Sequence, residues 1–160
     1  MVLFHFQNNS NLSQWQVLND VVMGGRSQAN FGVNNQGFAE FSGHVSLENN
    51  GGFSSVKYPL SPIDITNFNK LVIKIKGDNK RYQLRLKTNK LDAHSYITYF
   101  ETSGLWQELE FLFADFYPTY RGRRLELPNF PGEQMEELGF MIANKKAQDF
   151  KLEIAQIRIL

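Results

Sequence analysis

Two carboxylates stand beside two double-glycine segments, and these residues have the types and spacing that could do chemistry. Asp20 lies just before Met23-Gly24-Gly25, and Glu48 lies just before Gly51-Gly52. A pair of carboxylates on adjoining loops can act as general acid and general base. The alternative is structural, with Asp20 accepting hydrogen bonds from the amides of its own turn. We expect a structural or ligand-orienting role, since consecutive glycines indicate a closely fitted turn.

Three cations on separate predicted strands could form an anion-binding pocket. Arg26, Lys57 and Arg85 would converge if their strands were neighbours, with the Ser27 and Ser55 hydroxyls orienting the ligand. The alternative is a solvated sheet face, because Arg85 lies on the polar side of an alternating strand. Arg26 or Lys57 would then simply pair with Glu48. The sequence leaves both interpretations open.

We predict that a ligand- or partner-binding surface surrounds the two double-glycine turns and extends to the loop from Tyr117 to Arg124. The members of this surface are predicted to be Asp20, Met23, Gly24, Gly25, Arg26, Ser27, Glu48, Asn49, Lys57, Arg85, Tyr120 and Arg121. No catalytic residue is assigned among them, and we expect a protein that is not an enzyme.

Aromatic side chains on an exposed sheet face would allow the protein to stack against sugar rings. The available rings are those of Tyr96, Tyr99, Trp106, Tyr117 and Tyr120. Most aromatic residues at strand spacing belong to a core, and Trp106, like Trp15, is expected there. Tyr117 and Tyr120 are expected to be exposed.

The residue types and their spacing argue against metal, thiolate, cofactor and nucleotide sites. The three histidines are far apart and the chain has no cysteine, which argues against zinc and thiolate chemistry. We expect no cofactor; a structural calcium ion held by loop oxygens is compatible with such a chain but has no assigned ligands. The sequence contains no phosphate loop, dinucleotide motif or nucleophile elbow.

Length and charge narrow the function classes further. The 160 residues suffice for one domain, and we expect residues 1–160 to form it. The net charge of +1 gives no general attraction to nucleic acid, and the Arg121-Gly122-Arg123-Arg124 cluster alone is weak support for it. No apolar run is long enough to insert into a membrane, and the opening residues lack a secretory pattern, so we expect a cytoplasmic protein.

Alternating apolar and polar residues predict an all-β protein. From Phe38 to Glu48, one set of alternate positions is mainly apolar and the other set is polar, which is the pattern of a strand with one buried face. A partner strand is predicted from about Arg26 to Val33, and a tight turn joins the two strands. About ten such strands without intervening helices predict an antiparallel β-sandwich or jelly roll, with a closed barrel as the rival. In the last predicted strand, from Phe150 to Leu160, the apolar residues change from one set of alternate positions to the other near Ala155-Gln156, which predicts a β-bulge.

Three segments are expected to depart from this pattern. Short helical turns are predicted at Pro62 to Phe68 and at Gly132 to Leu138, the second with Glu133, Glu136 and Glu137 on its solvent side. The stretch from Ala114 to Pro131 is predicted to be irregular, and a loop of that length is usually functional or packed against the body.

Several segments together resemble the complex I intermediate-associated protein 30 family over about Trp15 to Ile159. The resemblance is carried by Asp20, Met23-Gly24-Gly25, Ser27, Phe41 to Leu47, Gly51 to Val56, Gly77-Asp78, Trp106, Tyr120-Arg121-Gly122 and Leu138-Gly139-Phe140. It implies a galactose-binding-like β-sandwich, similar to carbohydrate-binding modules, and an assembly-factor role for the mitochondrial members. Lys57 departs from the family, which more often has arginine there.

The resulting functional hypothesis is a binding domain, similar to a respiratory complex I assembly factor, that recognises a protein partner near the two double-glycine turns. The alternative is a carbohydrate- or small-ligand-binding module that uses the same cleft.

Overall fold

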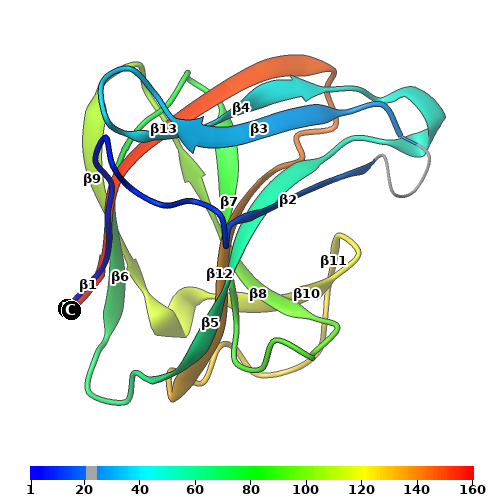
Figure 1. Cartoon of the computed structure of the whole chain (residues 1–160). Helices are drawn as coiled ribbons and strands as arrows, with labels where there is room; N and C mark the ends of the chain where they lie inside the picture. The colour runs from blue at the N-terminus through cyan, green and yellow to red at the C-terminus, as the bar shows by residue number, and fades with distance from the viewer. Residues whose placement is uncertain (21–24) are drawn as a thin grey trace.

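The computed structural model describes residues 1–20 and 25–160, and these form two facing antiparallel sheets (Figure 1). The six-stranded sheet has the order β3-β4-β13-β6-β9, with β1 also paired to β13. Its strands are β1 (Val2–His5), β3 (Gln28–Val33), β4 (Ala39–Val45), β6 (Lys70–Lys76), β9 (Trp106–Leu112) and β13 (Gln148–Ile159).

The second sheet has seven strands in the order β11-β10-β8-β7-β12-β5-β2. They are β2 (Gln16–Asn19), β5 (Ser54–Asp64), β7 (Arg81–Lys87), β8 (Ser95–Glu101), β10 (Tyr117–Tyr120), β11 (Arg123–Arg124) and β12 (Gln134–Ile142). The described residues also include two short 3-10 turns, η2 (Glu48–Asn50) and η3 (Phe113–Asp115). The predicted antiparallel β-sandwich is confirmed, and the open edges of both sheets exclude the closed barrel.

The predicted hairpin is β3 paired with β4, which confirms the period-two reading of this region. Phe31 lies opposite Phe41, and Val33 lies opposite Ala39. The Asn34 side chain accepts hydrogen bonds from the amides of Gln36 and Phe38. The Asn34 side chain thus satisfies backbone amides of the turn, where the hydrogen bonds between β3 and β4 end.

The predicted bulge in the last strand is also confirmed. The pairing of β13 with β6 shifts register between Ile154 and Gln156. One extra residue lets Ile154 and Ile157 both reach the core, where each is fully buried. The first half of β13 pairs with β4, and its second half pairs with β1 on the same side.

The predicted helical turns are wrong. β5 continues as a strand to Asp64, and only one hydrogen-bonded turn follows it, from the Phe68 amide to the Ile65 carbonyl at 2.9 Å. The segment Gly132 to Leu138 enters strand β12 instead of a helix. The misleading residues were Glu136 and Glu137, whose carboxylates are buried and paired.

The predicted irregular stretch from Ala114 to Pro131 holds two short strands. β10 pairs with β8, and β11 pairs back onto β10, so this segment forms one edge of the seven-stranded sheet. Leu125 and Phe130 donate backbone hydrogen bonds to Pro118 and Phe116. The segment is therefore held against the body, and β10 and β11 lie beside β8 at the edge of the sheet (Figure 1).

Apolar side chains from the inner faces of both sheets form one core. β12 is the most deeply buried strand on the seven-stranded side, with Met135, Leu138 and Phe140 fully enclosed. The two chain ends lie together, since the Met1 amino group donates to the Ile159 carbonyl at 2.7 Å. Among the described residues, no helix is long and apolar enough to cross a membrane.

Candidate functional site

The buried carboxylate of Asp20 fastens the two glycine turns together. Its Oδ1 accepts a hydrogen bond from the Ser27 amide at 2.8 Å, and its Oδ2 accepts one from the Ser27 hydroxyl at 2.5 Å. Oδ2 also accepts from the amides of Gly52 at 2.5 Å and Phe53 at 3.3 Å. One side chain therefore links the segment before β3 to the segment before β5. We call this arrangement the Asp20 clasp.

Two glycines are required by the Asp20 clasp because the carboxylate lies directly against their backbone. A Cβ atom at Gly25 would fall 2.3 Å from Asp20 Oδ1, and one at Gly51 would fall 2.4 Å from Oδ2. Both distances are far below a normal contact. The close fit that the consecutive glycines predicted is thus a fit around a carboxylate.

Ser27 extends the Asp20 clasp into the six-stranded sheet. Its hydroxyl donates to Asp20 and accepts a hydrogen bond from the Ser46 amide at 2.9 Å, just beyond β4. Asp20 and Ser27 are both fully buried. A carboxylate with no exposed surface, whose oxygens already accept four protein hydrogen bonds, supports the structural interpretation over proton transfer.

Acid should weaken the Asp20 clasp. Burial raises the pKa of Asp20, but hydrogen bonds from Ser27, Gly52 and Phe53 outweigh it, so that the pKa lies below its ordinary value of 3.8. A carboxyl group with a lowered folded-state pKa stabilises the fold above its unfolded pKa, and this contribution is lost as the pH falls through the folded pKa.

We therefore expect the free energy of unfolding of the wild type to fall steeply below about pH 4. The Asp20→Asn variant should lose less over the same range, because it lacks this titrating group. Urea unfolding at pH steps from 7 downward measures both slopes. Equal slopes for the two proteins would contradict a lowered pKa at Asp20.

A cleft of about 910 Å³ opens beside the second glycine turn, on the seven-stranded sheet. Its floor is formed by two rows of paired residues on neighbouring strands. In one row, Gln83 lies between Met141 and Tyr99. In the other row, Ile97 lies between Arg85 and Tyr117. Directly paired residues share one sheet face. The rim is formed by Gly51, Gly52, Phe53, Arg121, Gly122 and Lys145. The Asp20 clasp therefore holds part of the rim.

Cations dominate the charged residues of the cleft. Arg85, Arg121, Arg124 and Lys145 line it, and no aspartate or glutamate does so among residues 1–20 and 25–160. Arg85 is half-buried, and its Nη1 atom donates to Gln83 Oε1 at 2.6 Å. Burial lowers the pKa of Arg85, while the nearby Glu137 carboxylate raises it.

Two tyrosines of the cleft carry arginines stacked on their rings. The Arg124 guanidinium lies 4.4 Å from the ring centre of Tyr117, and that of Arg81 lies 4.0 Å from Tyr99. Burial raises the pKa of Tyr117, as does Tyr99, and the nearby arginines lower it only in part. The Tyr117 hydroxyl therefore stays protonated at neutral pH and can donate a hydrogen bond.

The structure brings together only part of the predicted surface. Gly25 and Ser27 belong to the Asp20 clasp, and Arg85 and Arg121 line the cleft. Met23 and Gly24 lie outside the described residues. Arg26, Glu48, Asn49 and Tyr120 are exposed and do not line the cleft. A binding role for any of the twelve stays a prediction.

The predicted three-cation pocket does not form as a unit. Lys57 and Arg85 lie in one row of the seven-stranded sheet, each opposite Gly139. Arg26 precedes β3 of the other sheet and does not line the cleft. Lys57 Nζ lies 3.6 Å from Glu137 Oε1, so its ion-pair partner is Glu137 and the proposed pairing with Glu48 is wrong.

The aromatic residues considered for stacking on sugars divide between the two sheets. Tyr99 and Tyr117 reach the cleft, Tyr96 is buried, and Tyr120 is exposed. Trp15 is in the core, as predicted. The core position predicted for Trp106 is wrong, since this residue is half-buried on the six-stranded sheet, where its ring centre lies 4.5 Å from that of Phe38.

Sequence reasoning missed several residues of this region. The sequence predicts Glu137 on the solvent side of a helical turn, whereas it is a buried carboxylate beside Lys57 and Arg85. Lys145 gave no signal, because it follows a strand without any motif. A strand from Leu138 to Ala143 is predicted by the sequence and confirmed as part of β12, and the alternation of Leu138, Phe140 and Ile142 could have placed Met141 on the opposite, cleft-facing side.

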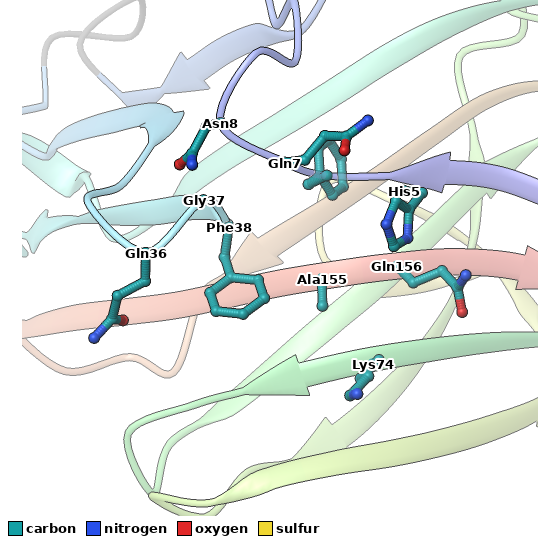
Figure 2. A pocket seen from close by; sticks show the side chains of 10 residues that line it. His5, Gln7, Asn8, Gln36, Gly37, Phe38, Lys74, Ala155 and Gln156 are labelled. Atoms are coloured by element: carbon teal, nitrogen blue, oxygen red, sulfur yellow. The ribbon is translucent and has the colours of Figure 1, made fainter.

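A smaller pocket of about 380 Å³ lies on the six-stranded sheet. Figure 2 shows His5, Lys74 and Gln156 on one side of it and Phe38 and Gln36 on the other, with Ala155 of the β13 bulge between them. The described residues contain no group of three or more His, Asp or Glu side chains placed to hold a metal ion. This pocket therefore offers one cation and one imidazole, without a metal-binding cluster.

Solved structures with this architecture confirm the galactose-binding-like fold. The family 11 carbohydrate-binding module of the Clostridium thermocellum cellulase Lic26A-Cel5E superimposes with a TM-score of 0.71 at 15% identity, covering 100% of this chain and 93% of the module. An exo-β-agarase matches with a TM-score of 0.64 at 13% identity over 99% of this chain and 24% of the enzyme. At such identities the likeness concerns the fold.

Sequence comparison identifies the family. The mitochondrial complex I intermediate-associated protein 30 of Drosophila melanogaster is 26% identical over 96% of this chain and 60% of its own length. The Mus musculus protein of the same name is 23% identical over 96% of this chain and 54% of its own length. The chain thus spans little more than half of these relatives. The family's sequence profile matches residues 4–154, which confirms the resemblance: the chain belongs to the complex I intermediate-associated protein 30 family.

Proposed function

We propose that this chain is a non-enzymatic binding domain that recognises a protein partner through the cleft on the seven-stranded sheet. Family membership suggests a role related to the assembly of respiratory complex I. The observation that carries the proposal is the cleft itself, which combines apolar side chains, hydrogen-bonding groups and cations beside a rim fixed by the Asp20 clasp.

The rigidity of the rim supports recognition of a partner in a defined geometry. Gly52 lines the cleft while its amide is held by the Asp20 carboxylate at 2.5 Å. Binding loses less free energy to ordering when the surface is already fixed. The volume of about 910 Å³ would accept several side chains of a bound segment.

A carbohydrate-binding role is the second candidate, because Tyr99 and Tyr117 lie on the same cleft of a fold shared with carbohydrate-binding modules. One face of each ring is already covered by a guanidinium, at 4.0 and 4.4 Å. Less ring surface is therefore left to stack on a sugar. This arrangement favours the protein partner.

Site-specific photo-cross-linking in the native cell tests the proposal. A photoreactive phenylalanine analogue at Tyr117, within the cleft, should give one dominant protein adduct. The same analogue at Leu105, which is 73% exposed and does not line the cleft, should not give that adduct. Absence of a protein adduct at Tyr117, or the same adduct in equal yield at Leu105, would refute recognition through the cleft.

A further inference from the structure

We infer that the segment held in the cleft is an extended acidic stretch of the partner protein, whose carboxylates are bound by Arg85, Arg121, Arg124 and Lys145. This inference rests on the proposed function and adds the chemistry of the partner. It follows from how the charges of the chain are distributed, from the geometry of the arginines, and from the backbone at two of the cations.

The first observation is that four cations line the cleft, of which Arg85 lies near the Glu137 carboxylate. Among residues 1–20 and 25–160, none of the four takes part in an ion pair, although Lys57, Lys70, Lys80, Lys151 and Arg158 all do. The whole chain has a net charge of only +1. Four cations without an ion pair therefore line one concave surface whose described lining holds no aspartate or glutamate, and this surface attracts a ligand of opposite charge.

The second observation is the orientation of the cleft arginines. The Arg124 guanidinium is stacked on the Tyr117 ring, and Arg85 is fixed through Nη1 to Gln83 Oε1. Stacking uses the face of a guanidinium and leaves its edge, which carries the N–H donors, free to bind a carboxylate. Two planar donors held in this way suit carboxylates better than neutral hydroxyls.

The third observation is the backbone of Arg121 and Lys145. Their φ angles are +50° and +58°, in the left-handed region that side-chain-bearing residues other than Asn and Asp rarely adopt. Glycine would fit both positions with less strain. Arg121 is the first of the two turn residues between Tyr120 of β10 and Arg123 of β11, a turn that requires positive φ, and Lys145 lies in the connection between β12 and β13. Both connections therefore present a cation to the cleft at a position where glycine would serve the backbone better.

Titration calorimetry with peptides tests the inference on the whole chain. We expect an octaglutamate peptide to bind at least about tenfold more tightly than octaglutamine, because charge-assisted hydrogen bonds are the strong ones. The triple variant Arg121→Gly, Arg124→Gln, Lys145→Gly should lose at least about tenfold in affinity for octaglutamate. Its melting temperature should stay within about 2 °C of the wild type or rise, since two strained positions are relieved.

A charge-matched control separates the cleft from general attraction. The variant Lys90→Gln, Arg123→Gln, Lys146→Gln removes three exposed cations that do not line the cleft and should keep the wild-type affinity within about twofold. Equal losses in both variants would overturn the inference, as would a fall of more than about 5 °C in the melting temperature of the cleft variant.

Two further outcomes separate this inference from the proposed function. If octaglutamate binds no better than octaglutamine while the Tyr117 cross-link persists, the acidic segment is wrong and the protein partner stands. If tetragalacturonate, an acidic sugar, binds at least as tightly as octaglutamate and no protein cross-links at Tyr117, both proposals fail together.

Discussion

Replacing Asp20 with asparagine should lower the free energy of unfolding by about 2–4 kcal/mol, one of the two largest effects we expect from a single substitution. Asparagine keeps the shape of the side chain but exchanges one carboxylate oxygen for an NH₂ group. That group would face donors, since Oδ2 accepts from the Ser27 hydroxyl and the Gly52 amide. Urea unfolding at pH 7 measures the loss.

The control for this substitution is Asp64→Asn. Asp64 also accepts hydrogen bonds, from the Thr66 amide at 3.0 Å and hydroxyl at 2.7 Å, but its side chain is exposed. Water can replace those bonds, so the loss should stay below about 1 kcal/mol. If Asp20→Asn cost no more than this control, Asp20 would not be the structural link between the two turns.

Replacing Gly51 with alanine is the second substitution of large expected effect, with a loss of about 2–4 kcal/mol. The new Cβ would lie 2.4 Å from Asp20 Oδ2 and 3.0 Å from the Glu48 carbonyl oxygen, so the carboxylate or the turn must move. Moving the carboxylate would also break its bond to the Gly52 amide. Chemical unfolding again measures the effect.

A double-mutant cycle identifies the cause of that loss. In the Asp20→Ala background the carboxylate is absent, so adding Gly51→Ala should cost at least about 1 kcal/mol less than in the wild type. Gly32→Ala is the matched control, because nothing lies within 4 Å of its Cβ position. Strict additivity of Asp20→Ala and Gly51→Ala would show that Gly51 is needed for a reason other than the carboxylate.

The fold could be predicted from the sequence because its strands carry a period of two that is visible without tertiary information. The hairpin of β3 and β4 and the bulge at Ala155 both follow from which phase is apolar. The helical turn predicted at Gly132 to Leu138 failed for the opposite reason. Glu136 accepts a hydrogen bond from the Lys90 amide in the loop after β7, and Glu137 pairs with Lys57 of β5, and no local pattern reveals these contacts.

The candidate site was predictable only where a local signal existed. Consecutive glycines beside Asp20 indicated close packing, and the Asp20 clasp accounts for Gly25 and Gly51. The cleft depends instead on which strands neighbour one another: β10, β8, β7 and β12 bring Tyr117, Arg85 and Met141 to one surface. That order is a tertiary property, so Arg26 could not be separated from Arg85 by sequence alone.

The cytoplasmic location stays a prediction, since the curated relatives named here are mitochondrial proteins. The single-domain organisation of residues 1–160 also stays a prediction.

The yield of protein adducts from photoreactive residues at three positions tests the central claim most directly. The positions are Tyr117 in the cleft, Lys74 in the smaller pocket and Leu105 on an exposed turn. If the cleft of the seven-stranded sheet is the binding surface, one adduct should form at Tyr117 in at least about tenfold higher yield than at either other position, as expected for a contact that excludes water and other partners. A partner captured chiefly from Lys74, or equally from all three positions, would contradict the account.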